Sequence, residues 1–337
     1  MPDPFLRLSL EDQREAISKA ADLSGRPEHL LEKDVWVVWA LNALFDSPLA
    51  QHLAFKGGTS LSKAYGVINR FSEDIDITVD IRQLIPDLVA GHLNALPPNR
   101  SQAANWSAEV RTRLPAWLSA HVVPLLQETL EHERIAASIE HQDDTLTLVH
   151  EPLATGTGYV DPRVILEFGG RSVPEPNEVR EVTCDAAPHL PMLAFPEARP
   201  RVMLPERTFW EKATAAHVYC LQQRLRGHRM SRHWHDLTRL DRAGVADRAA
   251  ADRELAHLVA HHKQWFFREK GVAGHVIDYQ DAVSGNLILV PSGKSLDDLA
   301  DDYNQMVADG LLLADAEPFD DLIASCEGLQ EKMNRLP

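Results

Sequence analysis

More than any other part of the chain, one stretch constrains its fold: residues Phe55 to Asp80, which read FKGGTSLSKAYGVINRFSEDIDITVD. Its first apolar residues stop at a glycine pair, and a segment with helical spacing begins at Thr59. The closing DIDITVD alternates polar and apolar residues with a period of two, which is typical of a strand. The stretch therefore predicts a strand, a helix and a second strand in direct succession.

The alternation in the second strand gathers two carboxylates. Because successive side chains of a strand point to opposite faces, Asp74 and Asp76 share one face, and Ile75 and Ile77 turn to the core. Adjacent carboxylates repel each other unless a cation lies between them, and hard oxygen ligands are those that Mg²⁺ prefers. These two aspartates are candidate magnesium ligands. A solvated strand end is the alternative, and it is the simpler interpretation of a bare DxD.

The residues before the aspartates favour a phosphate site. Gly57 and Gly58 allow a close backbone approach, and a helix that opens at Thr59 and Ser60 presents unpaired amides and the positive end of its dipole. Lys63 follows one turn later and either adds a positive charge for a triphosphate or is an exposed helix lysine. The segment is therefore a candidate nucleotide cradle.

A third carboxylate is expected if the site transfers phosphoryl groups with two metal ions. Glu167 fits this role, because it is the only charged residue in the apolar run VILEFGG. A position at a sheet edge is the other explanation for a lone carboxylate on such a strand. Arg70 and Ser72 lie just before the acidic pair and either serve the same site or orient the turn.

The rest of the chain indicates an α+β protein with two parts. At 337 residues it is longer than one hydrophobic core usually supports. We expect two helices between Leu10 and Phe45, an inserted helical stretch at Pro97–Arg134, a hairpin turning at Asp143–Asp144, and a strand closed by Gly169–Gly170. The sheet then has about five strands.

A proline-rich loop from Val173 to Pro205 separates these strands from a C-terminal part that is predominantly helical. The predicted lobes are residues 1–190, an α/β lobe with a mixed sheet, and residues 191–337, a helical lobe. No apolar run approaches the ~20 residues that span a bilayer, so we expect a cytoplasmic protein without a membrane partner.

Charge limits how the chain can bind nucleic acid. The formal net charge is −16, which argues against broad, nonspecific adhesion to RNA or DNA. One stretch is locally basic and is opposed there only by Asp236 and Asp241. Its arginines are Arg224, Arg226, Arg229, Arg232, Arg239 and Arg242. They either bind a phosphate backbone or neutralise the acidic C-terminal segment.

Three motifs together carry a family resemblance. FKGGTSLSKAYG…RFSEDIDI, RTFWEKATAAH and RHWHDLTRL resemble the AbiEii/AbiGii toxin family, which includes the MenT toxins and belongs to the polymerase-β-like nucleotidyltransferase superfamily. The similarity spans most of the chain, including DDYNQM…FDDLI near the C-terminus. It implies a bilobed fold with an N-terminal polymerase-β-like mixed sheet, flanking helices and a C-terminal helical lobe.

The resemblance also implies an activity. Such a protein uses Mg²⁺ and a nucleoside triphosphate, inhibits growth, and is controlled by a separately encoded antitoxin. Family members with known targets attach nucleotides to the 3′ acceptor end of tRNA. The implied site residues are Gly57, Gly58, Thr59 and Ser60 in the glycine turn, Asp74 and Asp76 at the metal, and Lys212 and Asp236 in the later motifs.

One departure concerns spacing. Fifteen residues separate Gly58 from Asp74, more than is typical of the wider superfamily. It therefore stays open whether Thr59 or Ser60 faces the phosphates. Without the resemblance, Lys212 reads as a surface lysine, and Asp236 as a carboxylate that pairs with Lys212 or holds an arginine.

The leading hypothesis is a nucleotidyltransferase toxin of an abortive-infection type toxin–antitoxin system. It would move a nucleotide from a nucleoside triphosphate to an acceptor, the 3′ end of tRNA or other RNA. Glu167 would complete the site, and Lys63 and Lys212 would counter charge on the phosphates. Two alternatives stay open: adenylylation or phosphorylation of a protein or small molecule, and a nucleotide-binding module without catalysis.

Overall fold

The fold is described from a computed structural model, for residues 2–70, 72, 74–154, 162–224, 229–312 and 316–335. The chain divides into two compact units. The first contains Met1–Ala64, Glu73–Gly91 and Trp106–Met203, and the second contains Tyr65–Ser72, His92–Asn105 and Leu204–Pro337. The predicted lobes, 1–190 and 191–337, are contiguous in sequence, whereas each unit draws on three separate segments of the chain.

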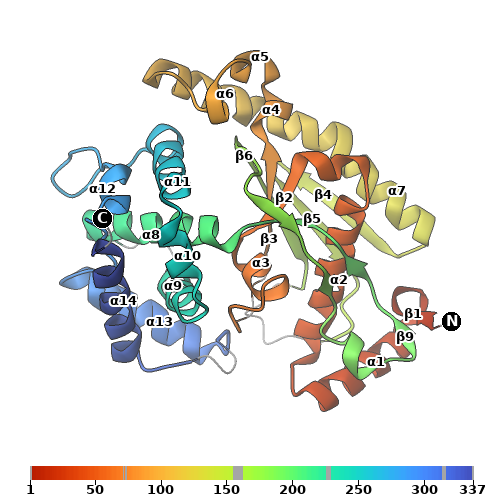
Figure 1. The fold of residues 1–337 in the computed structure, drawn as a ribbon. Helices are drawn as coiled ribbons and strands as arrows, with labels where there is room; N and C mark the ends of the chain where they lie inside the picture. The colour runs from red at the N-terminus through yellow and green to blue at the C-terminus, as the bar shows by residue number, and fades with distance from the viewer. Residues whose placement is uncertain are drawn as a thin grey trace. The chain divides into compact units, whose positions relative to one another are not determined.

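A mixed sheet of seven strands forms the centre of the first unit, in the order β4-β5-β6-β3-β2-β11-β7 (Figure 1). Its strands are β2 (Leu53–Lys56), β3 (Asp74–Asp80), β4 (Ala137–Gln142), β5 (Thr145–His150), β6 (Val164–Ser172), β7 (Asn177–Val179) and β11 (Arg201–Met203). The strand β3 runs parallel to β6, and β2 runs parallel to β11, while the other neighbours are antiparallel. The prediction of about five strands was wrong, because β7 and β11 are three-residue strands inside the proline-rich segment.

The predicted strand, helix and strand are confirmed as β2, α3 (Gly57–Lys63) and β3. The helix begins at Gly57, two residues before the predicted start at Thr59. The hairpin turn at Asp143–Asp144 is also confirmed, and Asp143 takes the left-handed conformation, with φ 53°, that such a turn requires.

The strand β6 was predicted to end at Gly169–Gly170, and this prediction was wrong because β6 continues to Ser172. A Cβ atom at Gly170 would overlap Leu84 of α4 (Ile81–Leu84) and lie 3.1 Å from Val110 of α6 (Arg100–Trp117). The second glycine of the pair therefore serves close packing of helices against the strand, and it does not end the strand.

The core lies on one face of the sheet. On that face the parallel register of β3 and β6 pairs Ile75 with Leu166 and Ile77 with Phe168. All four side chains are buried. Because neighbouring positions along a strand point to opposite faces, the same register leaves the aspartates of β3 on the other face.

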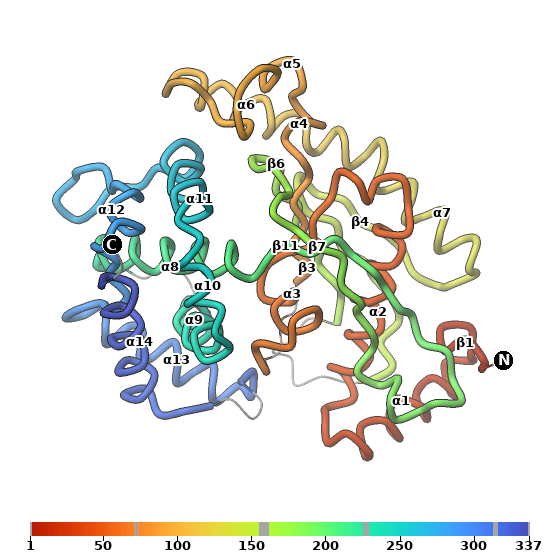
Figure 2. Tube along the Cα trace, viewed as in Figure 1, coloured from red at the N-terminus to blue at the C-terminus, as the bar shows by residue number. Residues whose placement is uncertain are grey.

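Helices complete the first unit. They are α1 (Leu10–Ser24), α2 (Glu28–Phe45), α4, α5 (Pro86–Val89), α6 and α7 (Val123–Glu133), with a π-helical turn at Leu118–Val122 and short 3₁₀ turns at Phe5–Arg7, Pro48–His52 and Ala187–His189. Two-residue strands β1 (Asp3–Pro4) with β9 (Leu193–Ala194), and β8 (Val182–Thr183) with β10 (Glu197–Ala198), form small separate sheets. Both helices predicted before residue 45 and the helical insertion at 97–134 are confirmed. Figure 2 shows α2 and α7 side by side.

The second unit is predominantly helical in its described part, as predicted. Its helices are α8 (Pro205–Gln222), α9 (Arg232–Arg242), α10 (Val245–Ala251), α11 (Arg253–Phe266), α12 (Tyr279–Val283), α13 (Lys294–Ala308) and α14 (Phe319–Asn334). The helix α8 packs against α9, α10 and α11, and α14 packs against α9 (Figure 2). In the parts of the chain that the structure describes, no helix is both long and apolar enough to cross a membrane.

Candidate active site

Three carboxylates of the first unit lie on the face of the sheet opposite Ile75 and Ile77. The register pairs Asp76 with Glu167 and Asp74 with Ile165, so Asp74, Asp76 and Glu167 all point to the face opposite the core. Neighbouring strands are ~4.8 Å apart, which brings Glu167 directly beside Asp76. The strand β6 lies inside the sheet, between β5 and β3, so a position at the sheet edge does not explain the charge of Glu167.

Gly57 lies against the second of these carboxylates. A Cβ atom at this position would overlap Oδ2 of Asp76, and the backbone of Gly57 has φ +78°, which L-residues rarely adopt. Only glycine satisfies both conditions at once. The turn between β2 and α3 therefore brings main chain, without an intervening side chain, up to the Asp76 carboxylate.

The two hydroxyls of the turn hold it together. Thr59 Oγ1 donates a hydrogen bond of 2.5 Å to the carbonyl oxygen of Asp74, and Ser60 Oγ donates one of 2.9 Å to that of Gly57. Both side chains are buried. The first bond links α3 to the start of β3, and the second closes the turn itself. Their contact with phosphates stays a prediction, and it would use hydroxyl lone pairs in addition to these donated bonds.

Lys63 lies in a cluster of buried charges. Its Nζ atom is 2.6 Å from Oδ1 of Asp34 and 2.7 Å from Oδ1 of Asp185. Burial alone would lower the pKa of Lys63, but the two carboxylates outweigh it and raise the pKa, so the lysine is charged. Asp34 Oδ2 also accepts a hydrogen bond of 2.6 Å from the backbone amide of Asp185, whose carboxylate pairs with Arg26. The cluster ties together α2, α3 and the segment before Ala187.

Sequence reasoning did not find Asp34 or Asp185. A signal was present for Asp34, because the charged EKD of α2 interrupts a helix in which nearly every residue from Leu31 to Leu44 is buried. A charged residue inside such a run requires a partner. The role of Lys63 at the triphosphate stays a prediction, and in this structure its charge is balanced by two carboxylates.

Magnesium fits the chemistry of the sheet face that carries Asp74, Asp76 and Glu167, called here the acidic face. Its donors are hard carboxylate oxygens, and the missing Cβ of Gly57 lets one of these carboxylates lie directly against the main chain. Among the residues that the structure describes, no three His, Cys, Asp or Glu side chains are gathered closely enough to hold a metal ion. Asp74, Asp76 and Glu167 would have to rotate about their side-chain bonds to close around one. The metal therefore stays a prediction.

In the second unit, Asp236 is a fully buried carboxylate held by two cations. Its Oδ1 atom is 2.7 Å from Nε of Arg70, and its Oδ2 atom is 2.9 Å from both Nη2 of Arg70 and Nζ of Lys212. The sequence left pairing with Lys212 and pairing with an arginine as alternatives, and both occur. Burial would raise the pKa of Asp236, but the charges of Arg70 and Lys212 prevail and hold it well below its ordinary value.

The pKa of Lys212 is lowered as well, but here burial is the prevailing cause. Its burial in α8 lowers the pKa of its ammonium group, and the attraction of Asp236 offsets this only in part. A lysine in this state gives up a proton more readily than an exposed one. The ion pair with Asp236 therefore fixes the position of the Lys212 ammonium group on α8, and this group has a lowered pKa.

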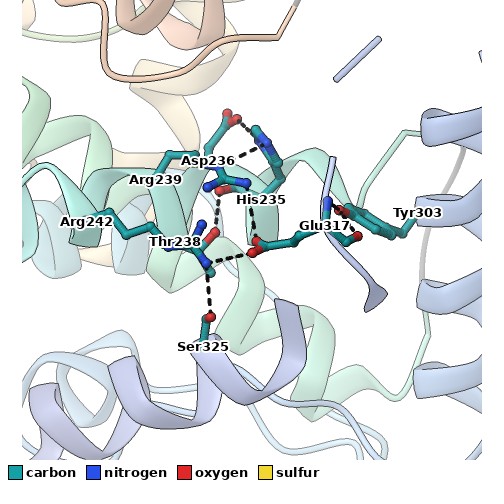
Figure 3. Close-up of polar contacts among 8 residues, drawn as sticks. All are labelled: His235, Asp236, Thr238, Arg239, Arg242, Tyr303, Glu317 and Ser325. Carbon is teal, nitrogen blue, oxygen red and sulfur yellow. Dashed lines mark hydrogen bonds and ion pairs between the residues drawn. The ribbon is translucent and has the colours of Figure 1, made fainter. Parts of the chain in front are cut away.

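The arginine stretch is partly engaged in ion pairs. Figure 3 shows Arg239 and Arg242 directed at the carboxylate of Glu317, at 3.4 Å and 2.7 Å. The backbone of Glu317 is itself held by the hydroxyl of Tyr303, at 2.9 Å. Asp302 accepts hydrogen bonds from the backbone amides of Arg229 and Ser231. Neutralisation by the acidic C-terminal segment is thus observed for Arg239 and Arg242, while Arg226 lies outside the described residues.

The predicted site residues form two groups. Gly57, Gly58, Thr59, Ser60, Lys63, Asp74, Asp76 and Glu167 belong to the first unit, and Lys212 and Asp236 belong to the second. Comparison with known proteins identifies the family of the chain. A family model described as "Nucleotidyl transferase AbiEii toxin, Type IV TA system" matches residues 39–325. The chain belongs to the AbiEii family. The predicted resemblance is confirmed, and this AbiEii protein is a nucleotidyltransferase toxin of a type IV toxin–antitoxin system.

Two solved structures are similar to this AbiEii toxin. MenT4, a nucleotidyltransferase toxin from Mycobacterium tuberculosis H37Rv, has 15% sequence identity and a TM-score of 0.41, with 96% of this chain and 88% of that chain covered. JHP933 from Helicobacter pylori has 16% identity and a TM-score of 0.40, with 92% and 93% covered. No curated protein matches the sequence. Family membership implies a nucleoside triphosphate as substrate and an antitoxin as partner.

Proposed function

We propose that this AbiEii toxin is a Mg²⁺-dependent enzyme that transfers a nucleotide from a nucleoside triphosphate to RNA, at the 3′ end of tRNA. The observation that carries the proposal is the pairing of Asp76 with Glu167 on one face, with Asp74 two residues away. Three carboxylates on adjacent inner strands are donors of the kind that divalent metal ions use, once their side chains turn toward one another, and metal ions serve phosphoryl transfer. The sheet is then the catalytic part of a polymerase-β-like lobe.

The site residues of the first unit have separate roles in this mechanism. Asp74 and Asp76 hold Mg²⁺, which, when bound, neutralises charge on the phosphates. Glu167 accepts the proton of the acceptor hydroxyl as its oxygen attacks the α-phosphorus and the bond to pyrophosphate breaks. Gly57 keeps the approach to Asp76 open, and the backbone amides of the turn contact the triphosphate.

Lys212 supplies positive charge to the phosphates in the proposed reaction, and Asp236 positions it. The pairing with a buried carboxylate fixes the ammonium group on α8. Its lowered pKa also suits it to protonate the departing pyrophosphate.

The proposal is tested by incubating the full-length protein with Mg²⁺, total RNA and each of the four nucleoside triphosphates, labelled at the α-phosphate. Label should appear in RNA of tRNA length. Asp76→Asn should abolish the transfer and leave the thermal unfolding temperature unchanged or raised, because it relieves repulsion with Asp74 and Glu167. Glu140→Gln, which removes an exposed carboxylate from β4 of the same sheet, should keep full activity.

Other results would separate the alternatives. Label on protein or on a small molecule, with none on RNA, would assign the chain to adenylylation or related modification. Absence of transfer with all four nucleotides, together with unchanged toxicity of Asp76→Asn in cells, would support a binding module. An Asp76→Asn variant that unfolds early while its folded fraction stays active would show that Asp76 is structural.

A further inference from the structure

Aromatic and cationic side chains occur together where α11 ends and in the loop that follows. Residues 261–276, called here the α11 tip, read HHKQWFFREKGVAGHV. They include three lysines or arginines and one glutamate, in a chain with a formal net charge of −16. The α11 tip is therefore locally basic, and its charge differs in sign from that of the whole molecule.

The tip exposes side chains that usually avoid water. Phe267 is 41% exposed and Val272 is 65% exposed. The ring of His262 lies 5.2 Å from that of Phe266 and 5.7 Å from that of Phe267, which forms a short aromatic row. Arg268 and Lys270, which follow these rings in the chain, are exposed. Apolar faces flanked by cations are what a stacked base and its phosphate need.

Backbone hydrogen bonds hold the loop of the tip in shape. The amide of Gly271 donates to the carbonyl of His275 at 3.0 Å, and that of Ile277 donates to Glu269 at 3.0 Å. The amide of Val272 donates to the carbonyl of Leu221, at the end of α8, at 3.1 Å. The exposed side chains are thus carried on an anchored loop, which lowers the entropy lost when a ligand binds.

Two of the three cations of the tip, Arg268 and Lys270, are available to a ligand. The single carboxylate, on Glu269, accepts a hydrogen bond of 2.8 Å from Nε2 of Gln222. Arg268 and Lys270 have no ion pair with any residue that the structure describes. In the arginine stretch, by contrast, Arg239 and Arg242 both pair with Glu317.

We propose that the α11 tip binds a single-stranded segment of the acceptor RNA, with a base stacked on Phe267 and phosphates paired with Arg268 and Lys270. This inference rests on the proposed function, because it takes RNA as the acceptor. Single-strand binding surfaces combine aromatic platforms with a positive groove in this way. A folded, acidic chain meets RNA where its local charge is positive.

The α11 tip is anchored to α8 at two separate points. Lys263 Nζ donates to the carbonyl of Glu211, next to Lys212, whereas Val272 bonds to Leu221. Ten residues of α8 separate these two anchor points, which corresponds to roughly 15 Å of helix. The loop of the tip around Val272 is therefore offset from Lys212 along α8, whereas the Lys263 end of the tip lies beside it.

The test measures binding of a fluorescein-labelled single-stranded RNA oligonucleotide to the full-length protein by anisotropy, over a range of salt concentrations. Phe267→Leu keeps an apolar side chain but removes the ring, and it should weaken binding about tenfold, while Phe267→Trp should keep it within about twofold. Arg268→Gln with Lys270→Gln should flatten the slope of log affinity against log salt by about 1.4. Arg7→Gln with Lys19→Gln removes two exposed cations elsewhere and should change neither value by a comparable amount.

Triphosphate binding, measured in parallel, should be unchanged in all variants, which also shows that they are folded. If the wild-type protein labels RNA but the tip variants bind the oligonucleotide with unaltered affinity and unaltered salt dependence, this inference is wrong while the proposed function stands. The inference is also overturned if the variants lose affinity only for the purified antitoxin. A wild-type protein that neither binds nor labels RNA would remove both the inference and the RNA acceptor.

Discussion

Gly57 combines two requirements at one position. Its backbone has φ +78°, and a Cβ atom there would overlap the Asp76 carboxylate. The sequence predicted that the glycine pair allows a close approach, and the structure shows that the group approached is a carboxylate of the acidic face. A single methyl group at this position would therefore act on the site directly.

Gly57→Ala should destabilise the fold by about 2–3 kcal/mol and lower transfer activity by at least tenfold, because strain in the turn adds to displacement of Asp76. Gly91→Ala is the matched control, since Gly91 has φ +79° and a Cβ atom added there would meet nothing within 4 Å. The control should lose only the backbone contribution, about 1 kcal/mol. Urea unfolding and label transfer measure the two effects. Equal losses in both variants would show that the contact with Asp76 is unimportant.

At the scale of elements, the sequence was informative where patterns are long or local. The succession β2, α3, β3 followed from alternation and a glycine turn, and the register of β3 with β6 then placed Glu167 beside Asp76. The strands β7 and β11 were missed because three residues are too few to show alternation, and their pairing is decided by distant parts of the chain. Asp185 was missed because it meets Lys63 only through tertiary packing, whereas the need of Asp34 for a partner was visible in the buried run of α2 but the partner was not.

Lys63 links α3 to α2 and to the segment before Ala187. Replacing it tests whether the lysine acts in the structure or at the triphosphate. Lys63→Met leaves Asp34 and Asp185 without their buried cation, so it should lower the free energy of unfolding by about 3–5 kcal/mol. The double variant Asp34→Asn/Lys63→Met should recover part of this loss. A double-mutant cycle measures this recovery: urea unfolding is compared among the wild type, Lys63→Met, Asp34→Asn and the double variant. A stable Lys63→Met protein with weakened triphosphate binding would instead assign the lysine to the nucleotide.

For the whole molecule, buried histidines couple stability to pH. Burial lowers the pKa of His217 from 6.5 to about 4, with a small opposing effect of Asp281. Its Nδ1 atom accepts a hydrogen bond of 3.1 Å from the backbone amide of Ile288, which requires the neutral ring. The folded state therefore binds this proton less readily than the unfolded state. The contribution of His217 to stability is complete above pH 6.5 and is lost as the pH falls toward 4.

Between pH 6.5 and 4 this single group should reduce the free energy of unfolding by about 3 kcal/mol. His217→Asn retains an acceptor for the amide of Ile288 but does not titrate, so its stability should vary less with pH over this range. Urea unfolding at several pH values, compared between wild type and variant, measures the difference. Parallel pH profiles for the two proteins would contradict the assignment.

The ion pair between Arg70 and Asp236 joins positions 166 residues apart within one unit. A ribosome adding roughly 5–20 residues per second needs roughly 8–33 s to make the chain between them. Until Asp236 emerges, Arg70 has been synthesised without the carboxylate that it will be buried against, and Lys212 likewise waits for this partner. A contiguous C-terminal fragment from Leu204 therefore lacks Arg70, one of the cations that Asp236 is buried against, and the toxin completes its second unit only late in its own translation.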